Sequence, residues 1–194
     1  MAAHNKEIEI QVKVENIKPL LEFLKKNAKH ISETSQIDRY FTPKHRNFLD
    51  KAHVSEWLRL RDADGQFTVM YKYWHYDEQD RGTYADEFET IIENLDEMKK
   101  IFKALDMKEI ACVHKLSRQT WIYKDYEVII DDVKGLGQFV ELEYCGKSKK
   151  TDHKKINAEM IKFLKDVGCG KVFQNHVGYP IMVMFPERVK FYEF

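Results

Sequence analysis

Acidic residues spaced two apart are the feature of this sequence that points most directly to chemistry. Three Glu-x-Glu pairs occur, at residues 7–9, 87–89 and 141–143, and each has an apolar residue between its two carboxylates. A β-strand places residues i and i+2 on one face, so each pair presents both carboxylates on the same side. Arg59 and Arg61 repeat this spacing with positive charge.

Like-charged residues on one face of a strand have two interpretations. In the first, each face is simply exposed to solvent. In the second, the four strands belong to one sheet curled on itself, whose interior holds many acids and bases. Buried charge is costly unless it is paired or bound to an ion. The repetition in four strands favours the second interpretation, and a polyanion held with divalent metal ions would suit such an interior.

Length and composition indicate one globular domain spanning residues 1–194. Apolar residues make up 43% of the chain, enough for a sizeable core, and the 32 basic residues balance the 32 acidic ones. A net charge of zero argues against a protein that binds nucleic acids or membrane surfaces in general. The chain has no apolar run near 18 residues and no signal-like N-terminus, so we expect a cytoplasmic protein. Three widely spaced cysteines indicate reduced thiols.

Hydrophobic periodicity predicts an α+β protein with many strands. Helices are expected from the Asn16 cap to residue 27, over 96–105, and over 152–167. The turn at residues 62–65 predicts a hairpin, and the aromatic tail from Val172 is expected to dock on the sheet. Strands are expected at residues 7–14, 36–41, 54–61, 67–74, 84–91, 110–116, 118–123, 127–131 and 139–144.

Taken in order, these motifs resemble the CYTH superfamily of triphosphate tunnel metalloenzymes. Within it the sequence is most similar to the class IV adenylyl cyclase (CyaB-like) proteins. The resemblance covers most of the chain and implies an eight-stranded antiparallel β-barrel, open as a tunnel and flanked by helices. Any one of the motifs is weak, whereas their shared order is specific. The matching stretches are residues 7–11, 37–41, 58–61, Lys72, 87–89, Lys115 with Arg118, and Asp131 with 135–143.

The resemblance also implies roles for individual residues. Basic side chains would hold phosphate oxygens, for which the arginine fork is well shaped. Carboxylates would hold Mg²⁺ or Mn²⁺, which prefer oxygen ligands. The predicted catalytic residues are Glu9, Glu143 and Lys115. The predicted substrate-binding residues are Gln11, Lys13, Arg59, Arg61, Lys72, Lys115 and Arg118. The predicted metal ligands are Glu7, Glu9, Glu87, Glu89, Asp131, Glu141 and Glu143.

Two positions depart from the family pattern. Gln11 stands where the family has a lysine, and Lys13 is the nearest cation on the same strand face. Ser117 stands at the arginine step of a Lys-x-Arg spacing, with Arg118 one residue further on. In a regular strand Arg118 would point outward unless a β-bulge re-aims it. A weakened or altered activity is one consequence of these departures.

Three functions remain open at this stage. The first is a cyclase that converts ATP to cyclic AMP and pyrophosphate, and we rank it first on the resemblance. The second is a triphosphatase acting on tripolyphosphate, thiamine triphosphate or a nucleoside triphosphate. The third is a non-catalytic module that binds a nucleotide or polyphosphate. The expected partner is a triphosphate, with no membrane and no nucleic acid, and a homodimer is left open.

Overall fold

A computed structural model describes residues 6–50, 54–76, 82–146, 152–175 and 177–194, and gives the backbone alone for residues 6, 7, 82 and 83. The strands are β1 Lys6–Glu7, β2 Glu9–Val14, β3 Lys29–Pro43, β4 Glu56–Ala63, β5 Gln66–Tyr76, β6 Gly82–Ile92, β7 Met107–Tyr123, β8 Tyr126–Val133, β9 Gly137–Tyr144, β10 Val172–Gln174 and β11 Tyr192–Glu193. The helices are α1 Lys18–Asn27, α2 Leu95–Ala104, α3 His153–Asp166 and α4 Tyr179–Met184, with 3-10 turns at Phe48–Asp50 and Pro186–Arg188.

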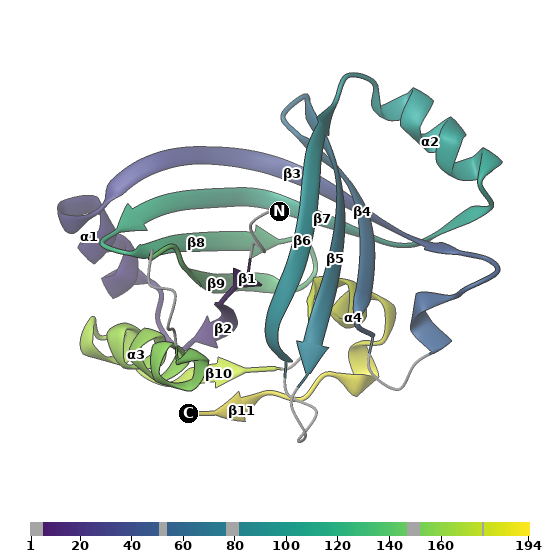
Figure 1. Ribbon diagram of the computed structural model, residues 1–194. Helices are drawn as coiled ribbons and strands as arrows, with labels where there is room; N and C mark the ends of the chain where they lie inside the picture. The colour runs from purple at the N-terminus through teal and green to yellow at the C-terminus, as the bar shows by residue number, and fades with distance from the viewer. Residues whose placement is uncertain (1–5, 51–53, 77–81, 147–151, 176) are drawn as a thin grey trace.

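Within the described residues the strands form one antiparallel sheet of 11 strands, in the order β1-β6-β5-β4-β3-β7-β8-β9-β2-β10-β11. Figure 1 shows β4, β5 and β6 crossing the direction of β8 and β9, so the sheet curls strongly. The predicted α+β class and antiparallel pairing are confirmed. The β4–β5 hairpin turns at Asp64 and Gly65, which both have positive φ, as a two-residue turn requires.

The expected closed eight-stranded barrel is wrong in its strand number and in its closure, because the sheet has 11 strands and no hydrogen bonds between the described residues close it. The predicted first strand is divided at Ile8: β1 pairs with β6, whereas β2 pairs with β9. The Ile8 carbonyl accepts from Tyr144 N at 2.9 Å, and its side chain packs in the core. The two parts of the sheet therefore meet through the chain at Ile8, a junction that we call the seam.

The apolar core lies mainly on the outer face of the sheet. In β9, Val140 and Leu142 are fully buried on this face. Leu24 of α1 and Leu164 of α3 belong to the same apolar cluster. Because side chains alternate along a strand, Glu141 and Glu143 take the opposite, inner face. Packing on the outer face thus sets the direction in which the charged residues point.

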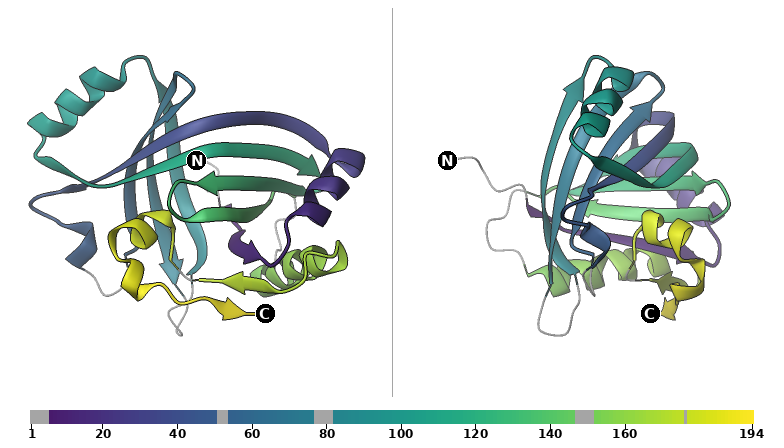
Figure 2. Two further views of the ribbon diagram at one scale, coloured as in Figure 1. Left: turned by 180° about the vertical axis from the view of Figure 1, so that it is seen from behind. Right: turned by 90° about the vertical axis from the view of Figure 1, so that its right-hand side faces the viewer.

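Helix α4 packs at one end of the curled sheet. Figures 1 and 2 show it between the strands β4–β6 and the strands β7–β9. Its Tyr179 and Met182 are buried against Trp57 of β4, Val113 of β7 and Phe139 of β9. The predicted docking of the C-terminal tail is confirmed in this segment. None of the helices in the described part of the chain is long and apolar enough to span a membrane.

Candidate functional site

The inner face carries a continuous series of ion pairs that begins at Asp38 on β3. Arg61 of β4 donates twice to this carboxylate, at 2.6 and 2.8 Å, and Lys115 Nζ lies 3.7 Å away. Burial alone would raise the pKa of Asp38, but the Arg61, Arg59 and Lys115 cations hold it well below its usual range. Asp38 entered the sequence analysis only as part of a motif, and its place here was not predicted.

The series continues through Asp131 on β8. Lys115 Nζ lies 3.4 Å from Asp131 Oδ2, and Arg118 donates to the same oxygen at 2.7 Å. Arg118 also donates to Glu141 at 2.8 Å, and Gln11 donates to the other oxygen of Glu141 at 3.0 Å. We call the series Arg61–Asp38–Lys115–Asp131–Arg118–Glu141 the buried ion-pair chain.

A β-bulge explains why both Lys115 and Arg118 point inward. The β7–β8 register shifts between Lys115 and Ser117, and Leu116 is exposed to solvent. The extra residue reverses the alternation, so Arg118 lies opposite Asp131 instead of facing outward. The β-bulge that Arg118 needs in order to point inward is therefore present. The same bulge explains why one strand, β7, replaces the two strands predicted there.

A second group of charges lies along the seam. Lys72 of β5 pairs with Glu9 of β2 at 2.9 Å and with Glu87 of β6 at 3.2 Å. Arg59 donates to Glu89 at 2.9 Å, and this carboxylate also accepts from the Thr68 hydroxyl at 2.7 Å. Burial raises and the Arg59 cation lowers the pKa of Glu89, and the net direction is downward. We call Glu9, Arg59, Lys72, Glu87 and Glu89 the seam cluster.

Lys13 does not take part in either group. Its Nζ donates to the Leu136 carbonyl at 2.9 Å and lies 4.7 Å from the Phe139 ring and 5.2 Å from the Phe191 ring. Burial lowers its pKa. Lys13 therefore does not replace the family lysine that Gln11 lacks. The Gln11 side chain itself binds Glu141.

Three carboxylates line up across neighbouring strands at one end of the inner face. Glu143 of β9 is the register partner of Glu9 on β2 and of Glu127 on β8. Burial raises the pKa of Glu127, and the nearby Glu141 carboxylate raises it further against the opposing effect of Arg118. Sequence reasoning missed Glu127 because it has no Glu-x-Glu partner; its alternation with Asp131 on one strand was the available signal.

No preformed metal site is present among the side chains that the structure describes. The predicted ligands Glu9, Glu87, Glu89, Asp131 and Glu141 all pair with cations instead. The predicted ligand Glu7 lies on β1, but its side chain falls outside the described residues.

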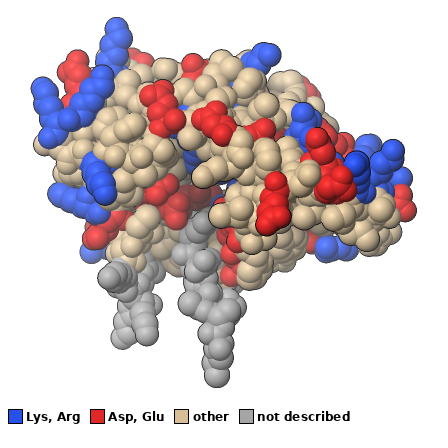
Figure 3. All heavy atoms as spheres, turned by 90° about the horizontal axis from the view of Figure 1, so that it is seen from above, with Lys and Arg blue, Asp and Glu red and all other residues tan. Residues whose placement is uncertain are grey.

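Formal charge on the inner face is negative. Among the residues whose side chains are described, six cations, the five that form ion pairs on β4, β5 and β7 and Lys13 of β2, stand against eight carboxylates, a difference of two negative charges. The carboxylates are Glu9, Asp38, Glu87, Glu89, Glu127, Asp131, Glu141 and Glu143. On the outside of the molecule, the face seen in Figure 3 has acidic side chains around its middle and basic ones mainly toward its edges.

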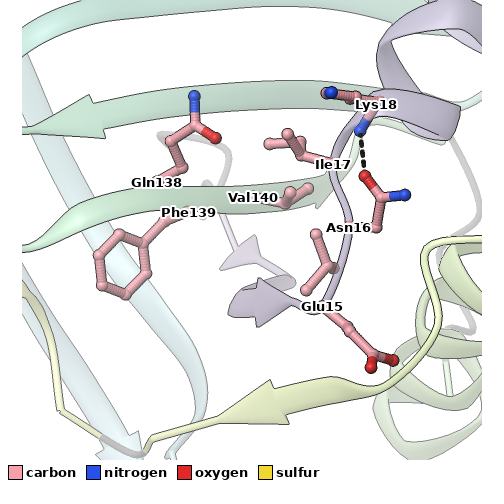
Figure 4. Close-up of a pocket in the computed structure, with 8 residues that line it drawn as sticks. Glu15, Asn16, Ile17, Lys18, Gln138, Phe139 and Val140 are labelled. Carbon is pink, nitrogen blue, oxygen red and sulfur yellow. Dashed lines mark hydrogen bonds between the residues drawn. The ribbon is translucent and has the colours of Figure 1, made fainter.

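A separate pocket lies where β2 leads into α1. Its lining includes Val14, Asn16 and Ile17 with Gln138 and Val140. Figure 4 shows Asn16 bonded to the backbone of Lys18 at the start of α1, where Asn16 Oδ1 accepts at 3.1 Å. None of the predicted catalytic, substrate-binding or metal-binding residues lines this pocket. The inner face is therefore the better candidate for the functional site.

Comparison with known proteins agrees with this geometry. The model of the CYTH domain family matches residues 5–169, which include all of the buried ion-pair chain and the seam cluster. The chain belongs to the CYTH family. A Methanocaldococcus jannaschii protein, named as a candidate adenylate cyclase, is 37% identical over 166 residues, which are 85% of this chain and 91% of that protein.

Solved structures show the same fold at lower identity. A Pyrococcus horikoshii protein has a TM-score of 0.71 at 22% identity, over 94% of this chain and 99% of that one. A candidate adenylate cyclase from Vibrio parahaemolyticus has a TM-score of 0.66 at 18% identity, over 85% and 90%. A Hippeastrum protein, whose title reports a dominant triphosphatase activity, has a TM-score of 0.65 at 14% identity, over 91% and 94%.

Proposed function

We propose that the inner face binds the phosphate chain of a nucleoside triphosphate together with Mg²⁺ or Mn²⁺, and that the protein is an enzyme of the class IV adenylyl cyclase type. The observation that carries this proposal is the convergence of five cations from β4, β5 and β7 on the inner face of the curled sheet. The name of the M. jannaschii relative favours cyclisation among the reactions of the CYTH family.

Arg59 is the cation best placed to bind an additional anion. Its side chain is buried and donates to Glu89 through one terminal nitrogen. Its Nε is also buried, and no acceptor for it exists among the described residues. A buried donor without an acceptor costs free energy that a phosphate oxygen would recover.

We assign the divalent cation to the carboxylates Glu9, Glu143 and Glu127, which are register neighbours on three strands. Like charges that face each other on neighbouring strands destabilise a sheet, and a cation between them removes this cost. Mg²⁺ commonly takes one or two carboxylates and completes its shell with water and substrate phosphate, so a full protein cage is not required. A bound ion would supply charge neutralisation at the phosphate oxygens. Because carboxylates outnumber cations on the inner face, we expect a triphosphate to bind there only together with such an ion.

In the cyclase reaction, the ribose 3′-hydroxyl attacks the α-phosphorus in line and pyrophosphate leaves. We assign the proton released by the hydroxyl to one of the two carboxylates Glu9 and Glu143, and the cation to the other one together with Glu127. Lys115, Arg118 and Arg59 would stabilise the negative charge of the leaving pyrophosphate. Trp74, whose ring centroid lies 4.9 Å from Lys72 Nζ, offers an aromatic surface for a base next to the phosphate-binding cations.

Triphosphate hydrolysis is the second candidate. The Hippeastrum protein has the same fold, and its title reports triphosphatase activity as dominant. The same cations would serve both reactions, since relatives that share a tunnel differ in which phosphorus is attacked. A module that binds without catalysis is the third candidate, because Gln11 leaves the first strand without its family cation.

Product analysis separates the three candidates. The purified protein is incubated with ATP, other nucleoside triphosphates or tripolyphosphate in the presence of Mg²⁺ or Mn²⁺, and the products are separated by chromatography. Cyclic AMP with pyrophosphate supports the cyclase, and release of phosphate supports the triphosphatase. Binding without turnover supports the module.

A matched pair of variants ties the result to the inner face. Arg59→Met should abolish measurable activity or binding, whereas Arg39→Met removes a surface arginine that pairs with Glu109 at 2.8 Å and should change neither. Equal behaviour of the two variants would contradict the assigned site.

A further inference from the structure

Helix α4 reaches the charged inner face through Tyr179. Tyr179 is 4% exposed, and its hydroxyl donates to Asp131 Oδ2 at 3.0 Å. Lys115 Nζ lies 5.3 Å from the centroid of its ring, and the ring packs edge-on against Phe139 with centroids 5.0 Å apart. Tyr179 lies beyond residues 5–169, the part of the chain that the family model matches. A segment outside that match thus contacts two members of the buried ion-pair chain.

The hydroxyl matters because Asp131 is fully buried between two cations. Its Oδ2 accepts from Arg118 at 2.7 Å and lies 3.4 Å from Lys115. Its other oxygen, Oδ1, is buried with no hydrogen-bond partner among the described residues. The Tyr179 hydroxyl donates one hydrogen bond to the Asp131 carboxylate without adding charge. Asp131 therefore needs fewer hydrogen bonds from the Lys115 ammonium.

The ring has a separate effect on Lys115. Its ammonium has three N–H donors. An aromatic face attracts the positive charge electrostatically and does so without using a strong acceptor. The nearest carboxylate oxygens are the Asp131 one at 3.4 Å and that of Asp38 at 3.7 Å, both longer than a good hydrogen bond. Lys115 is therefore held in place while its donors are incompletely used.

We propose that Tyr179 is a positioning residue for Lys115, and that its hydroxyl and ring keep the ammonium beside Asp131 with donors left for a bound phosphate chain. The inference rests on the proposed function, in which Lys115 contacts phosphate. It extends the site to the C-terminal segment and assigns α4 a part in substrate affinity.

Two substitutions separate the contributions of the ring and the hydroxyl. Tyr179→Phe removes only the hydroxyl and should weaken binding of tripolyphosphate with Mg²⁺, measured by calorimetry, about 3- to 10-fold. Tyr179→Leu also removes the ring and should weaken it about 10- to 100-fold. Tyr71→Phe is the matched control. Its hydroxyl donates to Glu56 at 2.8 Å on the outer face, and its loss should leave affinity unchanged.

A double-mutant cycle distinguishes positioning from general damage to the fold. If Tyr179 acts through Lys115, then Tyr179→Phe should change affinity by less than about twofold in a Lys115→Met background. The proposal is overturned if the full effect of Tyr179→Phe persists in that background, or if Tyr179→Phe binds tripolyphosphate as tightly as the wild type.

A third measurement does not depend on any ligand. Protons above an aromatic ring resonate upfield, so the ε-methylene signals of Lys115, assigned with Lys115→Met, should be shifted upfield of other lysines in the wild type and in Tyr179→Phe. The shift should disappear in Tyr179→Leu. An ordinary Lys115 signal in the wild type overturns the proposal. If the wild type binds no triphosphate, the proposed function fails, and this spectrum decides the placement of Lys115 by itself.

Discussion

The buried ion-pair chain and the seam cluster both pair acids with Arg and Lys, but their acids differ in access to water. The Asp38 and Asp131 side chains are 0% exposed, whereas those of Glu9 and Glu89 are 26% and 35% exposed. A buried charge that loses its partner costs several kcal/mol, whereas an exposed one regains water. The comparison indicates that the buried ion-pair chain is a rigid structural element. The acids of the seam cluster, in contrast, can give up their Lys and Arg partners and bind water or a metal ion when a phosphate chain binds.

The largest expected effect is on stability, from breaking the buried ion-pair chain. Asp38→Asn leaves Arg61 and Lys115 without their shared anion and should lower the free energy of unfolding by about 3–5 kcal/mol. Glu109→Gln, which breaks the surface pair with Arg39, is the control and should cost less than about 1 kcal/mol. Urea denaturation measures both. If both variants lost a similar free energy of unfolding, the buried ion-pair chain would be no more important for stability than a surface ion pair.

The next effect is on turnover, from the carboxylates at the seam. Glu9→Gln and Glu143→Gln remove charge at nearly constant shape, and each should lower turnover about 10²-fold, the scale of losing a group that stabilises charge in the transition state. Both variants should stay folded, because Glu9 and Glu143 are both partly exposed. Wild-type turnover and metal dependence in both variants would exclude the assigned metal site.

Acid should destabilise the protein through the buried ion-pair chain. Burial favours the neutral form of Glu141, but Arg118, Lys115 and Gln11 hold its pKa well below the usual range. A depressed pKa contributes stability above the unfolded carboxyl value of about 4, and the contribution is lost as pH falls below that value. Thermal unfolding from about pH 5 to about pH 2 should therefore show a shallower decline of Tm in Glu141→Gln than in the wild type. Glu159→Gln, at an exposed position of α3, should keep the wild-type slope.

The smallest effects are expected on the first strand. Lys13 bonds to the Leu136 carbonyl, so Lys13→Ala should change triphosphate affinity by less than about threefold. Gln11→Lys would place its ammonium beside Glu141, which already binds Arg118, and should tighten triphosphate binding by at most about 10-fold. Calorimetry at two salt concentrations tests both. If Lys13→Ala abolished binding, Lys13 would be a phosphate ligand, and the small effect expected here would be wrong.

Much of the site could be read from the sequence because it depends on alternation within single strands. The pairs Arg59 with Arg61 and Glu141 with Glu143 lie on the inner face, as their spacing predicts. Tyr179 could not be found in this way, and for Glu127 alternation with Asp131 indicates only the strand face and not the carboxylates beside it. Glu127 joins the site through its register with Glu143, and Tyr179 through the docking of a helix 48 residues away from Asp131 in the chain.

The sequence by itself determined which residues share a strand face, where the β4–β5 hairpin turns, and which family the chain resembles. These follow from local spacing, from the turn residues Asp64-Gly65 and from the order of motifs. Only the tertiary structure decided that a bulge at Leu116 turns Arg118 inward, that the sheet divides at Ile8 without closing by hydrogen bonds, and which acid pairs with which base. The physical reason is that register, bulges and ion pairs depend on the neighbouring strand, and local periodicity carries no record of that neighbour.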